Sequence, residues 1–210
     1  MPRLTSATRS ARRGQILAAA ASCFAGTGYH ATTMADVAAR AGVSKGTPYL
    51  YFASKQALFL ALHDEWDCGL SDQVEQAIRA LPDSRRSSPR QVLRTVAVVV
   101  GQYATAHAET CRVLLEAGTL AAYDPQIAAA VRASRARTHR RLEELFAAGV
   151  AAGEWPADTD PALQARLFTA SLEGLMSHWH LTPGSFSWEA AATALTEGRW
   201  SAATGLDQCP

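Results

Sequence analysis

The side chains best suited to chemistry lie in residues 45–55, where lysines, a threonine and tyrosines occur close together. The set consists of Lys45, Gly46, Thr47, Tyr49, Tyr51 and Lys55. A lysine can reach a phosphate or a guanine, a threonine hydroxyl can donate to a phosphate or a base edge, and a glycine allows close backbone approach. This combination indicates contact with DNA. The alternative is that both tyrosines belong to the core of a small helical bundle.

The residues before this set have the pattern of a short helix followed by a tight turn. One apolar face is formed by Met34, Val37, Ala38 and Ala41, at positions i, i+3, i+4 and i+7. Thr33 is a suitable N-cap. Gly42 can end the helix, because glycine adopts the left-handed conformation without a Cβ penalty. Two helices around such a turn are the layout of a helix-turn-helix, whose second helix enters the DNA major groove.

Pro48 lies inside this second helix as the pattern predicts it. A proline in a helix interior costs about 3 kcal/mol, whereas one at the first helical position costs almost nothing. We therefore expect Thr47 to be the N-cap and Pro48 to open the helix. Lys45 and Gly46 would then belong to the turn.

Four motifs follow one another in this region: GYHATT at 28–33, ADVAxxAGVS at 35–44, KGTxYxYF at 45–52 and SK at 54–55. Together they resemble the DNA-binding domain of the TetR, or tetracycline-repressor, family of bacterial transcriptional regulators. The resemblance covers about the first sixty residues.

The resemblance implies a role for each matching residue. Tyr49 and Leu50 would face bases and Tyr51 a phosphate, while Lys55 would clamp a phosphate. The remaining contacts would come from the start of the first helix of the motif, at Thr32 and Thr33.

The resemblance also implies an all-α fold of about nine helices. A three-helix helix-turn-helix head, which we place at residues 1–56, would join a helical effector-binding and dimerisation bundle at 57–210. The expected protein is a homodimeric, ligand-responsive repressor. It would bind a palindromic operator in double-stranded DNA, and a small apolar effector of unknown identity would release it.

Hydrophobic periodicity predicts helices over most of the remaining chain. The expected ranges are 10–26, 54–80, 89–107, 110–122, 124–152, 160–181 and 187–203, with a loop at 82–89 and a mobile basic arm at 1–9. The helix that begins near Ser54 continues across the expected domain boundary. We therefore expect the two domains to share a helix.

The net charge of +1 conceals an uneven distribution. Residues 1–60 hold seven basic residues and one acidic residue, a net charge of +6, so the remainder carries −5. A basic head on an acidic body suits a head that binds a polyanion. The sequence contains neither a signal-peptide pattern nor the roughly 20 apolar residues of a membrane span, so a cytoplasmic location is expected.

Aromatic side chains on several predicted helices of the body could line an effector pocket. We select Trp66, Tyr103, His107, Phe168 and Trp179. Pockets for small ligands are mostly apolar with a few polar groups. The alternative is that these residues are ordinary core.

The last two predicted helices carry small residues along one side. Small side chains allow helices to approach closely, and the resemblance implies that these helices pair with their copies. The expected dimer interface comprises Ala170, Gly174, Leu175, position 178, Ala191 and Leu195. Ordinary packing within one chain is the alternative.

Other chemistry has little support in the sequence. His178 and His180 are two residues apart, so they point away from each other on a helix, and no metal site is expected. No Ser-His-Asp or Cys-His spacing and no glycine-rich phosphate loop is present, so we expect neither an enzyme nor a cofactor. The alternative function is a helix-turn-helix protein of architectural or developmental role without an effector.

Overall fold

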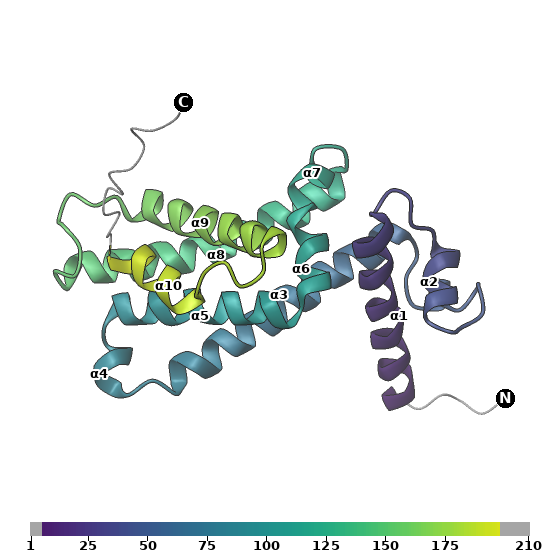
Figure 1. Ribbon diagram of the computed structural model, residues 1–210, viewed down its shortest axis with the longest axis horizontal. Helices are drawn as coiled ribbons and strands as arrows, with labels where there is room; N and C mark the ends of the chain where they lie inside the picture. Colours follow the sequence, from purple (N-terminus) through teal and green to yellow (C-terminus); the bar gives the residue numbers. More distant parts are fainter. Residues whose placement is uncertain (1–5, 198–210) are drawn as a thin grey trace. The chain divides into compact units, whose positions relative to one another are not determined.

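The computed structural model describes residues 6–197, and every regular element within that range is a helix (Figure 1). The all-α fold class is therefore confirmed. The elements are α1 (Ser6–Thr27), α2 (Met34–Arg40), a 3-10 turn η1 (Pro48–Leu50), α3 (Lys55–Arg79), α4 (Asp83–Arg86), α5 (Pro89–Ala106), α6 (Ala108–Leu115), α7 (Ala117–Ala121), α8 (Pro125–Ala151), α9 (Pro161–Leu181) and α10 (Trp188–Glu197). None of the described helices is both long and apolar enough to cross a membrane.

The chain divides into two compact units that interleave along the sequence. Among the described residues, the first unit comprises 6–69 and 107–134, and the second comprises 70–106 and 135–197. Helices α3 and α8 each contribute to both units. The expected boundary after residue 56 would divide the chain at a single point, whereas each of these units consists of two segments. The expected domain boundary stays a prediction.

The core of the first unit joins the helix-turn-helix region to later helices. Ile16 of α1, Val37 of α2 and Phe59 of α3 are fully buried, and they belong to one apolar cluster with Val113 of α6 and Ile127 of α8. Polar contacts also connect the helix-turn-helix region to the later helices. Gln56 Nε2 donates to Asp124 Oδ1 at 2.8 Å, and Ser22 Oγ donates to Glu109 Oε2 at 2.6 Å.

The second unit is built around aromatic side chains in contact with glycines. Trp188 of α10 lies against Gly101 of α5, and Trp155 lies against Gly149 of α8. A Cβ on either glycine would overlap the facing indole ring. Phe146 contacts Trp155 edge-on, with 5.2 Å between ring centroids.

Several expected boundaries differ from the observed ones. The single helix expected at 110–122 is two helices, α6 and α7. Glu116 lies between them, as the C-cap of α6 and the N-cap of α7. The expected loop at 82–89 contains the single turn α4. Residues 6–9 of the expected arm are helical, whereas 1–5, the end of the last helix at 198–203 and the tail lie outside the described residues.

Candidate nucleic-acid interface

The start of α2 is fixed by a reciprocal capping box. Thr33 Oγ1 accepts from the Asp36 amide at 3.2 Å, and the Thr33 amide donates to Asp36 Oδ2 at 2.8 Å. The hydrogen bond from the Thr33 side chain holds the pKa of the Asp36 carboxyl below its usual value. The expected N-cap role of Thr33 is confirmed, and its exposed side chain lies at the surface of the helix start.

The turn after α2 follows the expected pattern. Gly42 has φ +63°, in the left-handed region, and the Val43 amide donates to the Ala38 carbonyl at 3.0 Å. Gln15 of α1 adds a hydrogen bond from Nε2 to the Ala41 carbonyl at 2.7 Å. The end of α2 is thereby held against α1, and the chain leaves it in a defined direction.

Residues 44–52 form consecutive turns rather than an α-helix. The Thr47 amide donates to the Ser44 carbonyl at 2.9 Å, and η1 follows with Pro48 in its first turn. Thr47 occupies the expected position before η1, but its side chain makes no capping hydrogen bond. Thr47 already has helical angles, and its hydroxyl lies 2.8 Å from that of Ser44 instead of reaching forward. Pro48 does open the turn, and it is buried.

These turns present a tip to solvent. Tyr49 is 58% exposed and Leu50 73% exposed, and Lys45 and Gly46 are exposed beside them. The core alternative for Tyr49 is therefore wrong. Tyr51 is half-buried against the apolar cluster, whereas Phe52 is 5% exposed and belongs to the core. An exposed apolar and aromatic tip between polar residues is suited to contact with base edges.

Thr32 does not share this exposure. Its side chain is 1% exposed, and its hydroxyl lies 2.8 Å from the Gly28 carbonyl and 2.9 Å from Thr27 Oγ1. The hydroxyl therefore faces the protein, and we leave Thr32 out of the proposed contact set.

Lys55 has a different environment from the one expected of a phosphate clamp. Its ammonium donates to three carbonyl oxygens, those of Tyr29 at 2.7 Å, His30 at 2.9 Å and Thr32 at 2.9 Å. It also lies 4.6 Å from the centroid of the Tyr29 ring, and burial lowers the pKa of Lys55. An ammonium has three donors, so all of them are engaged by the segment that leads into α2. Sequence spacing gives no sign of this arrangement, because the partners are backbone atoms.

Comparison with known proteins decides which family has this arrangement. A sequence model of bacterial regulatory proteins of the tetR family matches residues 16–62. A model of the C-terminal part of BetI-type transcriptional repressors matches residues 89–198, about half of the chain. The chain belongs to the TetR family of bacterial transcriptional regulators.

Individual relatives agree with this assignment. The transcriptional activator FasR of Mycolicibacterium smegmatis is 36% identical over 124 residues, which is 59% of this chain but 53% of FasR. The regulator TtgR of Pseudomonas putida is 28% identical over 88% of each chain. Among solved structures, the fatty acid degradation regulator FadR of Bacillus halodurans superposes with a TM-score of 0.77 at 20% identity, over 90% of this chain and 96% of FadR.

The residues expected to line an effector pocket of this TetR-family chain are distributed over both units. Trp66 and His107 belong to the first unit, and Tyr103, Phe168 and Trp179 belong to the second. Within the second unit, Tyr103 and Phe168 are buried and Trp179 is half-buried. The pocket stays a prediction.

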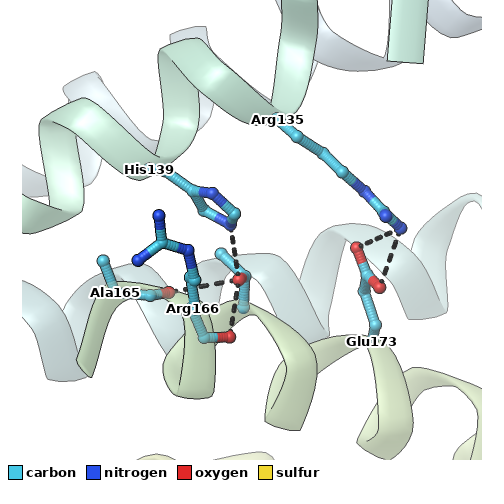
Figure 2. Close-up of polar contacts among 6 residues, drawn as sticks. Arg135, His139, Ala165, Arg166 and Glu173 are labelled. Atoms are coloured by element: carbon cyan, nitrogen blue, oxygen red, sulfur yellow. Dashed lines mark hydrogen bonds and ion pairs between the residues drawn. The ribbon is translucent and has the colours of Figure 1, made fainter. Parts of the chain in front are cut away.

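A hydrogen-bonded layer fixes α8 against α9 in the second unit (Figure 2). Arg135 Nη2 donates to both carboxylate oxygens of Glu173 at 3.0 Å, and His139 Nε2 lies 3.0 Å from Thr169 Oγ1. Arg135 thereby pairs with a carboxylate of the neighbouring helix rather than with one of its own helix.

Five of the six positions expected at a dimer interface line one apolar groove of the second unit, and Ala170 is not part of the lining. Its volume is about 340 Å³, and its lining comprises Ser171, Gly174, Leu175, His178, Ala191, Ala194 and Leu195. A Cβ on Gly174 would meet no atom within 4 Å. The same side of α9 also exposes Leu163, Leu167 and Leu181, the last with 78% of its surface accessible. These leucines are not among the expected interface residues, although their helical spacing from Gly174 places them on the same side of α9.

Proposed function

We propose that this TetR-family regulator is a ligand-responsive homodimeric repressor that binds a palindromic operator. The observation that carries the proposal is the exposed tip at Tyr49 and Leu50, which follows a capped and anchored α2 within a segment of net charge +6. We assign base contacts to these two residues. Lys45, Gly46, Thr47, Tyr51 and Thr33 would contact the backbone or the neighbouring base edges.

The groove between α9 and α10 supports a homodimer. Exposed leucines along α9 and small residues around Gly174 form an apolar face that one chain leaves uncovered. Pairing with the same face of a second copy would remove it from water. Two heads in one dimer would then read two half-sites about one DNA turn apart, or a multiple of that distance.

The body offers an apolar environment for an effector. Phe146, Phe168 and Trp188 share the core cluster of the second unit, and Trp179 packs against it. We infer a small apolar effector that changes the spacing of the two heads and lowers operator affinity. Coupling energies of this kind are about 1–3 kcal/mol. Such a protein would act in the cytoplasm and without catalysis.

Selection of genomic DNA fragments on the purified protein tests the proposal. We expect enrichment of an inverted repeat, and Tyr49→Ala should relax base preference at one step of each half-site. The matched control is Tyr123→Ala, because Tyr123 is also strongly exposed but lies outside the helix-turn-helix. Recovery of fragments without a common sequence would support the alternative of an architectural DNA-binding protein. An operator complex that is not dissociated by a ligand of any class would support the same alternative.

A further inference from the structure

We propose that Arg9, Ser10 and Arg13 of α1, together with Tyr51, form a binding pocket for a phosphate of the DNA backbone. The pocket rests on the proposed function of the head and adds a contact from a helix outside the helix-turn-helix motif. Its volume is about 350 Å³, and it is lined by these four residues and Leu50. All five belong to the first unit.

The lining is suited to a phosphodiester. Two guanidinium groups supply charge and paired donors, and the hydroxyls of Ser10 and Tyr51 supply two further donors. No carboxylate lines the pocket. Arginine binds phosphate oxygens in a bidentate manner, so the chemistry favours an anion with several oxygens over a neutral ligand.

Arg13 is held in position before any ligand binds. It forms an ion pair with Glu65 of α3, and its guanidinium carbon lies 5.2 Å from the centroid of the Phe52 ring. Phe52 belongs to the core, so the ring is a fixed support. The Glu65 side chain is about half exposed, so its ion pair with Arg13 can be exchanged for a contact with a phosphate. An ordered guanidinium loses less side-chain entropy when it binds.

Arg9 lies one helical turn before Arg13 on the same side of α1. Like charges at i and i+4 destabilise a helix by a few tenths of a kcal/mol. An anion between them turns this repulsion into two attractive contacts. The pair therefore favours the bound state over the free one.

The position of the pocket identifies the source of the phosphate. Leu50 belongs both to the pocket lining and to the exposed tip, and Tyr51 follows it directly in the chain. A group bound there would lie beside the segment proposed to enter the groove, where the DNA backbone passes. The ammonium of Lys55 is already engaged by three carbonyls, so this pocket supplies charge that the expected clamp does not.

The test measures operator affinity against salt concentration. Each lost phosphate contact reduces the slope of log K against log salt by about 0.9. Arg9→Gln should therefore flatten the slope by about 1.8 for a dimer with two heads. Sequence preference should stay the same, because phosphate contacts carry no base information.

Arg12→Gln is the matched control, since Arg12 lies on the same helix, bonds to Gln15 and does not line the pocket. It makes the same change in charge, and the slope should change by much less. Equal slopes for Arg9→Gln and the wild type, or equal losses for Arg9→Gln and Arg12→Gln, would overturn the pocket while leaving the DNA-binding function intact.

Glu65→Gln tests the same site with the opposite sign. Without its carboxylate partner, Arg13 is free for the phosphate, and we expect operator affinity to rise several-fold at low salt. An unchanged or lower affinity would remove Arg13 from the site.

The last experiment measures the melting temperature in the presence of inorganic phosphate. Suppose that phosphate raises the melting temperature of the wild type but not of Arg9→Gln, while both proteins have the same DNA salt slope. This result would assign the pocket to a free anion and overturn a DNA contact. Failure of the wild type to bind any duplex would overturn the proposed function and the pocket together.

Discussion

At the scale of single residues, Lys55 shows how a side chain can position the proposed DNA-binding surface through bonds within the protein. Its three hydrogen bonds connect the first turn of α3 to the backbone before α2. That backbone sets the position of Thr33 and hence of the α2 N-terminus. We therefore treat Lys55 as a positioning residue of the head.

Lys55→Met should destabilise the protein, because it keeps the aliphatic stem but leaves three carbonyls without their donor. The expected cost is about 1–3 kcal/mol, which at this chain length lowers the melting temperature by about 2–4 °C per kcal/mol. Lys45→Met, at an exposed position of the same head, should leave the melting temperature unchanged. An unchanged melting temperature for Lys55→Met with a flatter DNA salt slope would restore the phosphate-clamp interpretation.

The capping box gives the head a dependence on acid. The pKa of Asp36 is lowered by its bonds to Thr33, so its contribution to stability is present above the unfolded pKa near 4. That contribution is lost as the pH falls through the folded pKa. Asp36→Asn should lower the urea midpoint at pH 7 and should show a smaller further loss at pH 3 than the wild type.

Other lowered carboxyl pKa values, at Asp124 and Glu189, leave a residual acid dependence in that variant. Asp64→Asn makes the same charge change at an exposed position of α3 and is the control. Parallel pH curves for Asp36→Asn and the wild type would show that the capping box does not titrate as described.

At the scale of elements, the close approach of α5 and α10 depends on one glycine. Gly101→Ala would place a Cβ into the indole of Trp188, which is itself buried. Overpacking of this kind costs about 1–3 kcal/mol or more. Thermal unfolding should therefore shift downward by several degrees.

Gly118→Ala is the control, since a Cβ at this helical position meets no atom within 4 Å. Alanine is the better helix former by up to about 1 kcal/mol, so this variant should be neutral or more stable. Equal melting temperatures for the two variants would show that α10 can move away from α5 at little cost.

The helices themselves could largely be predicted from the sequence, because apolar periodicity and residues that start helices are local signals. Such residues are Ser54 and the Asp-Pro pairs at 124–125 and 160–161. The ranges of α3, α5, α8 and α9 agree with the expected ones to within about two residues. The break at Glu116 and the 3-10 character of 48–50 were not predicted, since both depend on tertiary packing. For the same reason, the sequence does not show that the polar atoms of Thr32 and Lys55 bond within the protein, and their expected DNA contacts stay predictions.

At the scale of the whole molecule, the uncovered face of α9 and α10 predicts how the chain assembles. Gly174→Leu should leave the fold of the protomer unchanged, because a larger side chain there enters open space. It should obstruct a close crossing between two copies. Light scattering should show monomer or a concentration-dependent mixture, while the far-ultraviolet circular dichroism spectrum stays helical.

Leu167→Glu tests the same face at a second point, because Leu167 is half exposed and its helical spacing places it on the same side of α9 as Gly174. Glu143→Gln, on the exposed surface of α8, should not change the mass in solution. A dimer of unchanged affinity in both α9 variants would place the interface on another surface.

The interleaved core of the first unit has a consequence for synthesis on the ribosome. Helices α1 to α3 emerge first, but their apolar cluster includes Val113, Leu120 and Ile127. At about 5–20 residues per second, roughly 3–13 seconds pass between residue 62 and the arrival of these partners. During this interval the nascent head exposes unpaired apolar surface, which is the surface that chaperones recognise. A chain terminated before residue 113 would therefore lack part of the apolar core that holds α1 to α3 together.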